Sequence, residues 1–288
     1  MHALFAAHPE IYAVVKEVLK AVFWLVLVSL IFPPLEYAFS VRRERILYKG
    51  LVTDILWFWV HRMTGFLWLT PPVLFVGWIL HSILPTGLTG PIGALPLLVR
   101  LPLAFVVYEL GLYWGHRWSH EIPFIWRFHA VHHSAEHMGY MANARFHPVD
   151  VLLTRLAGLI PLFALGLDTL SGPHAALISI VIVNVGSIWS FFIHANVNWR
   201  LGPLEALVAS PFFHHWHHTK TDHIDRNYAT VLPVMDRIFG TLYMPDAWPA
   251  EYGTSTPLPG TMIGQLTAPF IPGALTPVSA PGEASRAA

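Results

Sequence analysis

Histidine is the residue type whose spacing in this sequence most strongly suggests chemistry. The chain has 288 residues and 18 histidines, and three short segments hold eight of them. One segment has the spacing i, i+4 and two have the spacing i, i+3, i+4: His116 and His120; His129, His132 and His133; His214, His217 and His218. Side chains at these spacings share one helix face, so each segment presents two or three imidazoles to one point. Chance would produce such a triple about 0.07 times in a chain of this composition, and two are present.

The number of imidazoles predicts more than one metal ion. Tetrahedral zinc takes four ligands, whereas eight imidazoles suit two ions that keep open positions. His194, at the end of the last apolar run, is the candidate for a ninth ligand, and Asn196 or Asn198 for a tenth, weaker contact. Imidazole suits iron, zinc, copper and nickel, so the ligand type alone leaves the metal open.

Other polar residues are candidates for supporting roles. His137 follows His133 by four residues and is a candidate extra ligand, while His147 is expected to orient a ligand or to face the substrate. A metal-binding imidazole needs an acceptor for its second N–H group. The carboxylates available for this role are Glu109, Glu121, Asp150, Asp225 and Asp236. His215 lies on the wrong face of its segment to join the others.

The composition indicates that lipid is part of the solvent of this chain. Hydrophobic residues make up 55% and charged residues only 12%, with a mean hydropathy of +0.52. Soluble domains are about 25% charged, so there is too little polar surface here for a soluble globule of this size. The net charge is zero, which offers no electrostatic case for a nucleic-acid partner. With no cysteine, the chain cannot bind a metal or haem through thiolates.

The elements that must position the histidines are apolar helices. The apolar runs cover residues 21–39, 51–68, 69–84, 95–114, 151–170 and 174–193. Residues 51–84 are either one kinked span or a surface helix followed by a span. We therefore expect an all-α integral membrane protein with four or five transmembrane helices and a helical cap that carries the histidines.

The distribution of lysine and arginine predicts which side of the membrane the cap occupies. If residues 40–50 are cytoplasmic, residues 115–150 and those after 194 are cytoplasmic too, and these regions hold most of the basic residues. The two turns on the opposite side hold none, as the positive-inside rule requires. We expect one domain over residues 1–272, with a core at about 50–270. Residues 273–288 are rich in Pro, Gly and Ser and are expected to be disordered.

The histidine segments and their neighbours resemble the fatty acid hydroxylase/sterol desaturase superfamily over roughly residues 50–270. The segments that carry the resemblance are YWGHRWSH at 113–120, HAVHH at 129–133, RFHPVD at 145–150, HHWHH at 214–218 and DRNYATVLPVMDRIFGT at 225–241. The sequence departs from the family pattern at Ala229, where Gly is usual, and at Met235, where Trp is common. Neither residue is a proposed ligand.

The resemblance implies a membrane-bound oxidoreductase with two iron ions held almost wholly by histidine. It would use O₂ to hydroxylate or desaturate an unactivated C–H bond of a lipid. Two electrons would come from a separate donor, a ferredoxin or small haem protein, with its reductase. The lipid is expected to enter from the bilayer, past Trp114, Phe124, Trp126 and Trp216. Whether it is a sterol, a fatty acyl chain or an isoprenoid is left open, as is hydroxylation versus desaturation.

Other functions fit the sequence less well. A zinc-dependent membrane hydrolase would use the motif His-Glu-x-x-His, which the sequence lacks. A metal transporter would place its ligands in the middle of the spans, whereas these histidines follow the ends of apolar runs. An inactive metal-binding or lipid-binding membrane protein is the remaining alternative, although all eight histidines of the three segments are present.

Overall fold

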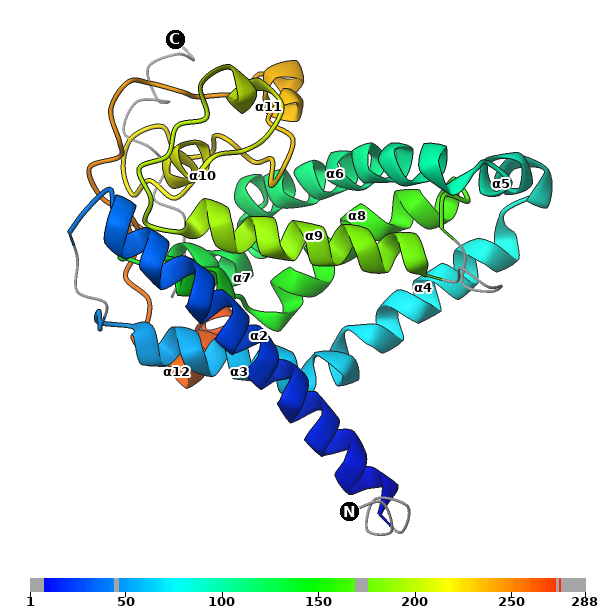
Figure 1. Ribbon diagram of the computed structural model, residues 1–288, viewed down its shortest axis with the longest axis horizontal. Helices are drawn as coiled ribbons and strands as arrows, with labels where there is room; N and C mark the ends of the chain where they lie inside the picture. The colour runs from blue at the N-terminus through cyan, green and yellow to red at the C-terminus, as the bar shows by residue number, and fades with distance from the viewer. Residues whose placement is uncertain (1–7, 44–46, 169–175, 273–274, 276–288) are drawn as a thin grey trace.

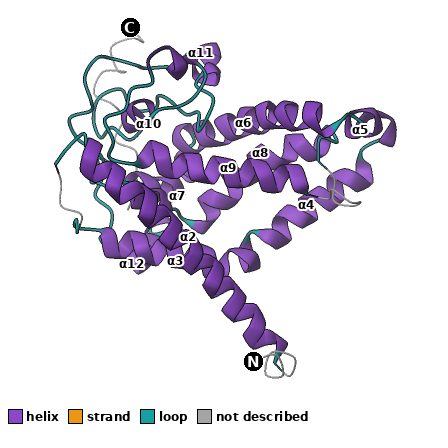
Figure 2. Cartoon of the chain, in the orientation of Figure 1, coloured by secondary structure: helices purple, strands orange, loops and turns teal. Residues whose placement is uncertain are grey.

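The computed structural model describes residues 8–43, 47–168, 176–272 and 275, and these are helices joined by loops (Figure 2). Among them there is no strand, and only one isolated bridge pairs Thr219 with Tyr252. The expected all-α fold is confirmed. The disorder predicted for residues 273–288 concerns a segment that lies outside the described residues except for Leu275.

Within the described residues, four helical segments are long and apolar enough to cross a membrane: Ile11–Phe39, Leu51–Ile83, Leu97–Glu121 and Leu177–His194. They correspond to α2 (Pro9–Phe39), to α3 (Leu51–Trp68) with α4 (Thr70–Ile83), to α6 (Leu97–Glu121) and to α9 (Leu177–His194). The chain is therefore a multi-pass membrane protein, with the number of spans at the lower of the two predicted values.

Helices α3 and α4 follow each other directly and form one kinked segment, Leu51–Ile83, that is long and apolar enough to cross a membrane. The chain turns between them (Figure 1), and α4 has a proline in its first turn. Pro71 and Pro72 carry no backbone N–H, so they cannot continue the hydrogen bonding of α3. The backbone N–H of Leu69 still donates to Gly65 at 2.9 Å, which keeps the two helices joined.

Helix α6 packs closely against α8 (Pro148–Ala164), and the two lie alongside α9 in Figure 1. Glycines make this approach possible. A Cβ atom at Gly111 would lie 2.2 Å from the carbonyl oxygen of Ala157, and one at Gly158 would lie 2.5 Å from the ring of Tyr108. Small residues at helix contacts of this kind are typical of membrane proteins. The short helix α5 (Thr86–Gly93) connects α4 to α6.

The remaining short helices gather at one end of the spans, where α2, α6 and α9 end and α3 begins (Figure 1). They are α7 (Pro123–His133), η1 (Tyr140–Ala144), η2 (Gly202–Ala206), α10 (Pro211–His217), α11 (Val234–Phe239), α12 (Met262–Thr267) and η3 (Ala268–Phe270). We call this set, with its connecting loops, the cap. Polar contacts tie it to the spans. The Arg145 guanidinium donates to the buried Asp54 carboxylate of α3 at 2.6 Å, and the Trp57 indole donates to Gln265 at 2.8 Å.

Candidate metal centre

Nine histidines form two buried groups at the junction of the spans and the cap. The first group has one ring nitrogen from each of five histidines, all within 4.8 Å of one another: His116, His120, His129, His133 and His217. The second group has one ring nitrogen from each of four histidines, again all within 4.8 Å of one another: His132, His194, His214 and His218. The two groups adjoin, because the rings of His133 and His218 stack at 4.3 Å. These nine histidines are the nine that the sequence singled out as metal ligands.

Four helices converge to position these side chains. Helix α6 supplies His116 and His120 from its last turns, α7 supplies the second histidine segment, and α9 ends on His194. Helix α10 carries the third segment, and its first turn is capped by the Ser210 hydroxyl, which accepts from the backbone N–H of Phe213. Most of these rings come from the last turns of short or ending helices, where the chain can bring several of them to one point.

Hydrogen bonds at Nδ1 fix the orientation of the first group. The Nδ1 atom of His116 lies 2.6 Å from the carbonyl oxygen of Tyr228, and that of His129 lies 3.0 Å from the buried carboxylate of Asp150. The Nδ1 atom of His217 lies 2.9 Å from the carbonyl oxygen of Arg226. Oxygens of this kind only accept, so each Nδ1 donates, and a neutral imidazole then has a lone pair at Nε2.

Two of the four rings in the second group are oriented in the same way. His132 donates through Nδ1 to the carbonyl oxygen of Arg145 at 3.1 Å, and His194 donates to that of Ser190 at 2.7 Å. The ring of His132 also stacks on Phe146 at 3.9 Å.

The Nε2 atoms of several of these rings face one another at distances suited to binding the same metal ion. His116 and His129 place their Nε2 atoms 3.1 Å apart, and so do His132 and His194. Neither pair can share a hydrogen bond, because both protons are already used at Nδ1. Two lone pairs at this distance repel. With metal–nitrogen bonds of about 2.1 Å, two ligands at a right angle lie about 3.0 Å apart, which is the spacing found.

Further unpartnered atoms and the charge state of the rings agree with a metal site. The buried Nε2 atoms of His120 and His217 have no hydrogen-bond partner among the described residues. Burial, together with the neighbouring imidazoles, lowers the pKa values of His133, His217 and His218 well below the usual value. These rings are therefore neutral near pH 7, which is the form that binds a metal ion. The two groups are able to bind metal.

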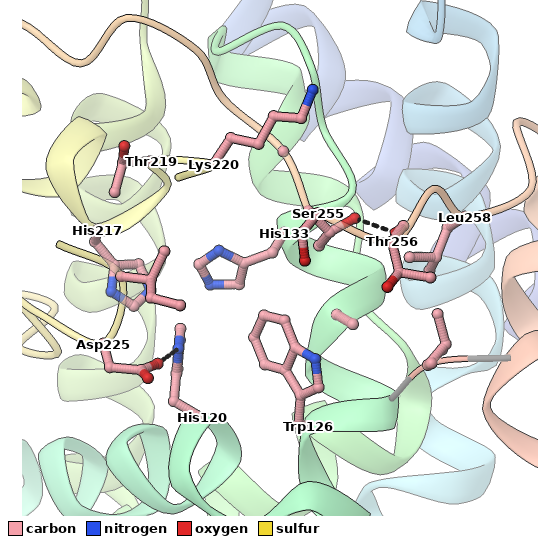
Figure 3. Close-up of a pocket in the computed structure, with 15 residues that line it drawn as sticks. His120, Trp126, His133, His217, Thr219, Lys220, Asp225, Ser255, Thr256 and Leu258 are labelled. Atoms are coloured by element: carbon pink, nitrogen blue, oxygen red, sulfur yellow. Dashed lines mark hydrogen bonds and ion pairs between the residues drawn. The ribbon is translucent and has the colours of Figure 1, made fainter. Parts of the chain in front are cut away.

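Of the five extra candidates, only Asp225 contacts a histidine of the two groups. Its carboxylate accepts from Nδ1 of His120 at 3.1 Å (Figure 3), so it orients that ring. The Asn196 side chain is engaged by the backbone of Val41 and Arg42 and is not offered to a metal. Asn198 is exposed and belongs to neither group.

His137 and His147 also lie outside the two groups. His137 stacks on Tyr48 at 3.9 Å, and His147 caps α8 by accepting from the backbone N–H of Val149. Both have structural contacts that explain their positions.

The remaining carboxylates orient backbone and surface groups. Glu109 accepts from the backbone N–H of Val231, and Asp236 accepts from those of Tyr228 and Ala229. Asp236 thus holds the segment whose Tyr228 carbonyl orients His116. Glu121 pairs with Arg117 at 2.8 Å.

A cavity of about 360 Å³ reaches the histidines from among the spans. Its walls come from α3, α6, α8 and α9, and His116, His129, His132, His194 and His214 lie at its inner end. None of the four aromatic residues that the sequence suggested lines it. Trp114 packs instead on Phe239, and the Trp216 indole donates to the carbonyl oxygen of Ala247. Spacing in the sequence could not show that these rings face the cap.

A second, smaller cavity of about 80 Å³ reaches the first group from the cap side (Figure 3). His120, His133 and His217 line it together with Trp126. The ring of Trp126 lies 5.2 Å from that of His120 and 5.5 Å from that of His133. The metal centre thus lies between two cavities, and only the larger one opens among the spans.

The sequence is similar to proteins named as a lipid hydroxylase and a monooxygenase. The family model described as fatty acid hydroxylase matches residues 101–241, a segment that contains all nine histidines. The ornithine lipid hydroxylase OlsE of Rhizobium tropici is 34% identical over 180 residues, which cover 61% of this chain and 51% of that protein. The alkylglycerol monooxygenase of Danio rerio is 32% identical over 162 residues, 54% of this chain and 33% of that protein.

A sterol desaturase is among the relatives as well. The putative Delta(7)-sterol-C5(6)-desaturase 2 of Arabidopsis thaliana is 28% identical over 149 residues, which cover 50% of this chain and 48% of that protein. The chain thus spans about half or less of the length of these relatives. No solved structure matches it significantly. The histidine segments and the match over residues 101–241 together place this chain in the fatty acid hydroxylase/sterol desaturase superfamily.

Proposed function

We propose that this protein is a di-iron oxidoreductase that uses O₂ to hydroxylate or desaturate an unactivated C–H bond of a lipid. The observation that carries the proposal is the pair of adjoining histidine groups at the inner end of a cavity that opens among the spans. Eight or nine imidazoles exceed what one ion needs, and relatives named as hydroxylase, monooxygenase and desaturase share the family.

In this proposal the nine histidines hold two iron ions, and the surrounding residues keep the rings in place. The irons would supply the activation of O₂ and the removal of hydrogen from carbon. Asp150, Asp225 and four backbone carbonyls fix six of the rings at Nδ1, so that their Nε2 atoms would face the iron ions. The cavity walls hold the lipid so that one carbon lies beside the histidines. Such positioning matters, because a displacement of about 1 Å can cost about 100-fold in rate.

We further propose that the cap lies on the cytoplasmic side and accepts electrons from a separate ferredoxin or small haem protein. Most of the described basic residues lie on the cap side of the spans, as the positive-inside rule predicts for a cytoplasmic face. A cysteine introduced by Arg237→Cys, at an exposed position of the cap, would react with a membrane-impermeant thiol reagent only in inverted vesicles. Turnover with NAD(P)H in the absence of any added donor would contradict the need for a separate donor.

The metal content of the purified protein tests the central proposal. We expect two irons per chain in detergent-purified protein, and a loss of iron in His132→Ala and His217→Ala. His215→Ala is a matched control, because that imidazole is equally buried in the third histidine segment but contacts Tyr252 and the carbonyl oxygen of Ala195. It should lose stability without losing iron. One zinc per chain, or a metal content indifferent to the first two substitutions, would overturn the proposal in favour of a hydrolase or a binding protein.

A further inference from the structure

The larger cavity contains uncompensated positive charge. Arg62 of α3 and Arg155 of α8 both line it, and no aspartate or glutamate does. Both arginines lie on the helices that surround the cavity, where an unpaired charge is costly and marks a site of function.

Neither guanidinium has a carboxylate partner in the part of the chain that the structure describes. Arg62 lies over the rings of Trp24 at 4.8 Å and Phe58 at 5.5 Å. Arg155 donates to the Tyr108 hydroxyl at 2.7 Å. These contacts hold each guanidinium in place and leave several N–H donors on each for a ligand. By contrast, the buried Arg145 of the same region has its own carboxylate partner in Asp54.

The rest of the cavity fits an amphiphile. Its wall on α9 includes Asn184 and Ser187, whereas Phe58, Leu112, Val183 and Phe191 supply apolar surface. Arg155 follows Asp150 by five residues on α8, so it lies about 8 Å along the helix axis from the level of the carboxylate that orients His129.

We propose that this cavity binds a lipid with an anionic head group, neutralised by Arg62 and Arg155, and that the reacting carbon lies within about 8–10 Å of that group. This inference rests on the proposed function, since it names the class of lipid that the same site takes. Planar guanidinium groups match phosphate and carboxylate oxygens, and the tail would occupy the apolar part of the cavity. Neutral lipids, such as unmodified sterols, would leave both charges uncompensated.

Binding to the full chain in an uncharged detergent tests this. The probes are radiolabelled hexadecyl phosphate and neutral hexadecylglycerol, which share the same tail. We expect the wild type to bind the phosphate at least about ten-fold more tightly, and Arg62→Gln and Arg155→Gln each to remove about ten-fold of that preference. The affinity for hexadecylglycerol should stay unchanged. Arg237→Gln is the control, because it removes the same charge from an exposed position of the cap.

Two further measurements separate the effect of charge from misfolding and a lipid site from a free-anion site. Arg155→Lys and Arg62→Lys retain the charge and should keep most of the preference, even where the glutamine variants fail to fold. Glycerol 3-phosphate, which has a head group and no tail, should fail to displace hexadecyl phosphate; displacement at equal concentration would overturn a lipid site in favour of a free-anion site. Equal affinity for both amphiphiles, or a preference unchanged in the arginine variants, would overturn the inference.

Iron content measured on the same preparations separates the two proposals. A lost preference in protein that holds two irons overturns only the head-group assignment. A preserved preference in protein without iron overturns the proposed function and leaves the anionic lipid site standing.

Discussion

The substitution Asp150→Asn tests whether the contacts at Nδ1 hold the metal centre together. Asp150 is fully buried and accepts from Nδ1 of His129 at 3.0 Å. His129 is central to the first group, since its Nε2 lies 3.1 Å from those of both His116 and His133. Asparagine keeps the shape but removes the negative charge and half of the acceptor capacity. The imidazole then loses basicity and a fixed orientation.

The expected magnitude follows from the burial of this pair. Loss of a partner that orients a metal ligand costs 10-fold to 100-fold in metal affinity, about 1.4–2.7 kcal/mol. Asp225→Asn is the matched comparison, because Asp225 makes the same contact to His120 at 3.1 Å with a side chain that is 48% exposed. Solvent screens that pair, so we expect at most about a three-fold loss.

The assay is iron retention against a graded chelator, read as iron per chain at each chelator concentration. Asp150→Asn should lose one iron at 10-fold to 100-fold lower chelator concentration and keep the iron of the second group, since His132 and His194 have their own acceptors. An Asp225→Asn effect as large as that of Asp150→Asn would refute the argument from burial. Simultaneous loss of both irons would refute the independence of the two groups.

Three other outcomes are expected. Gly111→Ala should lower the Tm and the iron content, because the added Cβ would lie 2.2 Å from the carbonyl oxygen of Ala157 and push α6 away from α8. Gly186→Ala is the control: a Cβ there would have no atom within 4 Å, so the Tm and the iron content should stay unchanged. Burial and the nearby Arg145 and Arg42 lower the pKa of His137 to about 4. The neutral imidazole therefore costs no stability above pH 6.5, and the free energy of unfolding falls as the pH drops from 6.5 towards 4. His137→Gln should remove this part of the pH dependence, about 2 kcal/mol. A water-soluble chelator should remove iron in two phases, with the faster phase from the first group. The reason is that the histidines lining the cap-side cavity, His120, His133 and His217, all belong to that group. Removal of all the iron in a single phase would contradict this difference in access.

Much of the metal centre could be predicted from sequence because helical periodicity is a local property. The spacings i, i+3 and i+4 alone indicated that His129, His132 and His133 share a face, and the structure places all three in the two adjoining histidine groups. The division into groups could not be predicted in this way. His132 belongs instead to the group of His194 and His214, and its Nδ1 donates to the carbonyl oxygen of Arg145, the C-cap residue of η1.

The cavity could not be predicted, since its walls come from helices far apart in the sequence. Arg62 lies beside His61 within the apolar run at residues 51–68, and spacing alone gives neither residue a partner. The structure places His61 against the carbonyl oxygen of Phe146 at 2.9 Å and Arg62 at the cavity wall. The signal that could have drawn attention to the cavity was the presence of single arginines within apolar runs that have no acidic residue at helical spacing.

The arrangement of the ligands also determines how the cap and the spans depend on each other. Helices α6 and α9 end in the two groups, while α7 and α10 belong wholly to the cap, so every metal position is shared between cap and spans. Without a cation, the facing lone pairs at 3.1 Å in His116–His129 and His132–His194 would repel. On the proposed function, a bound metal would therefore join the cap to the spans at the inner end of the larger cavity. We expect lipid binding and metal binding to be coupled for this reason, because each would stabilise the same junction of α6, α9 and the cap.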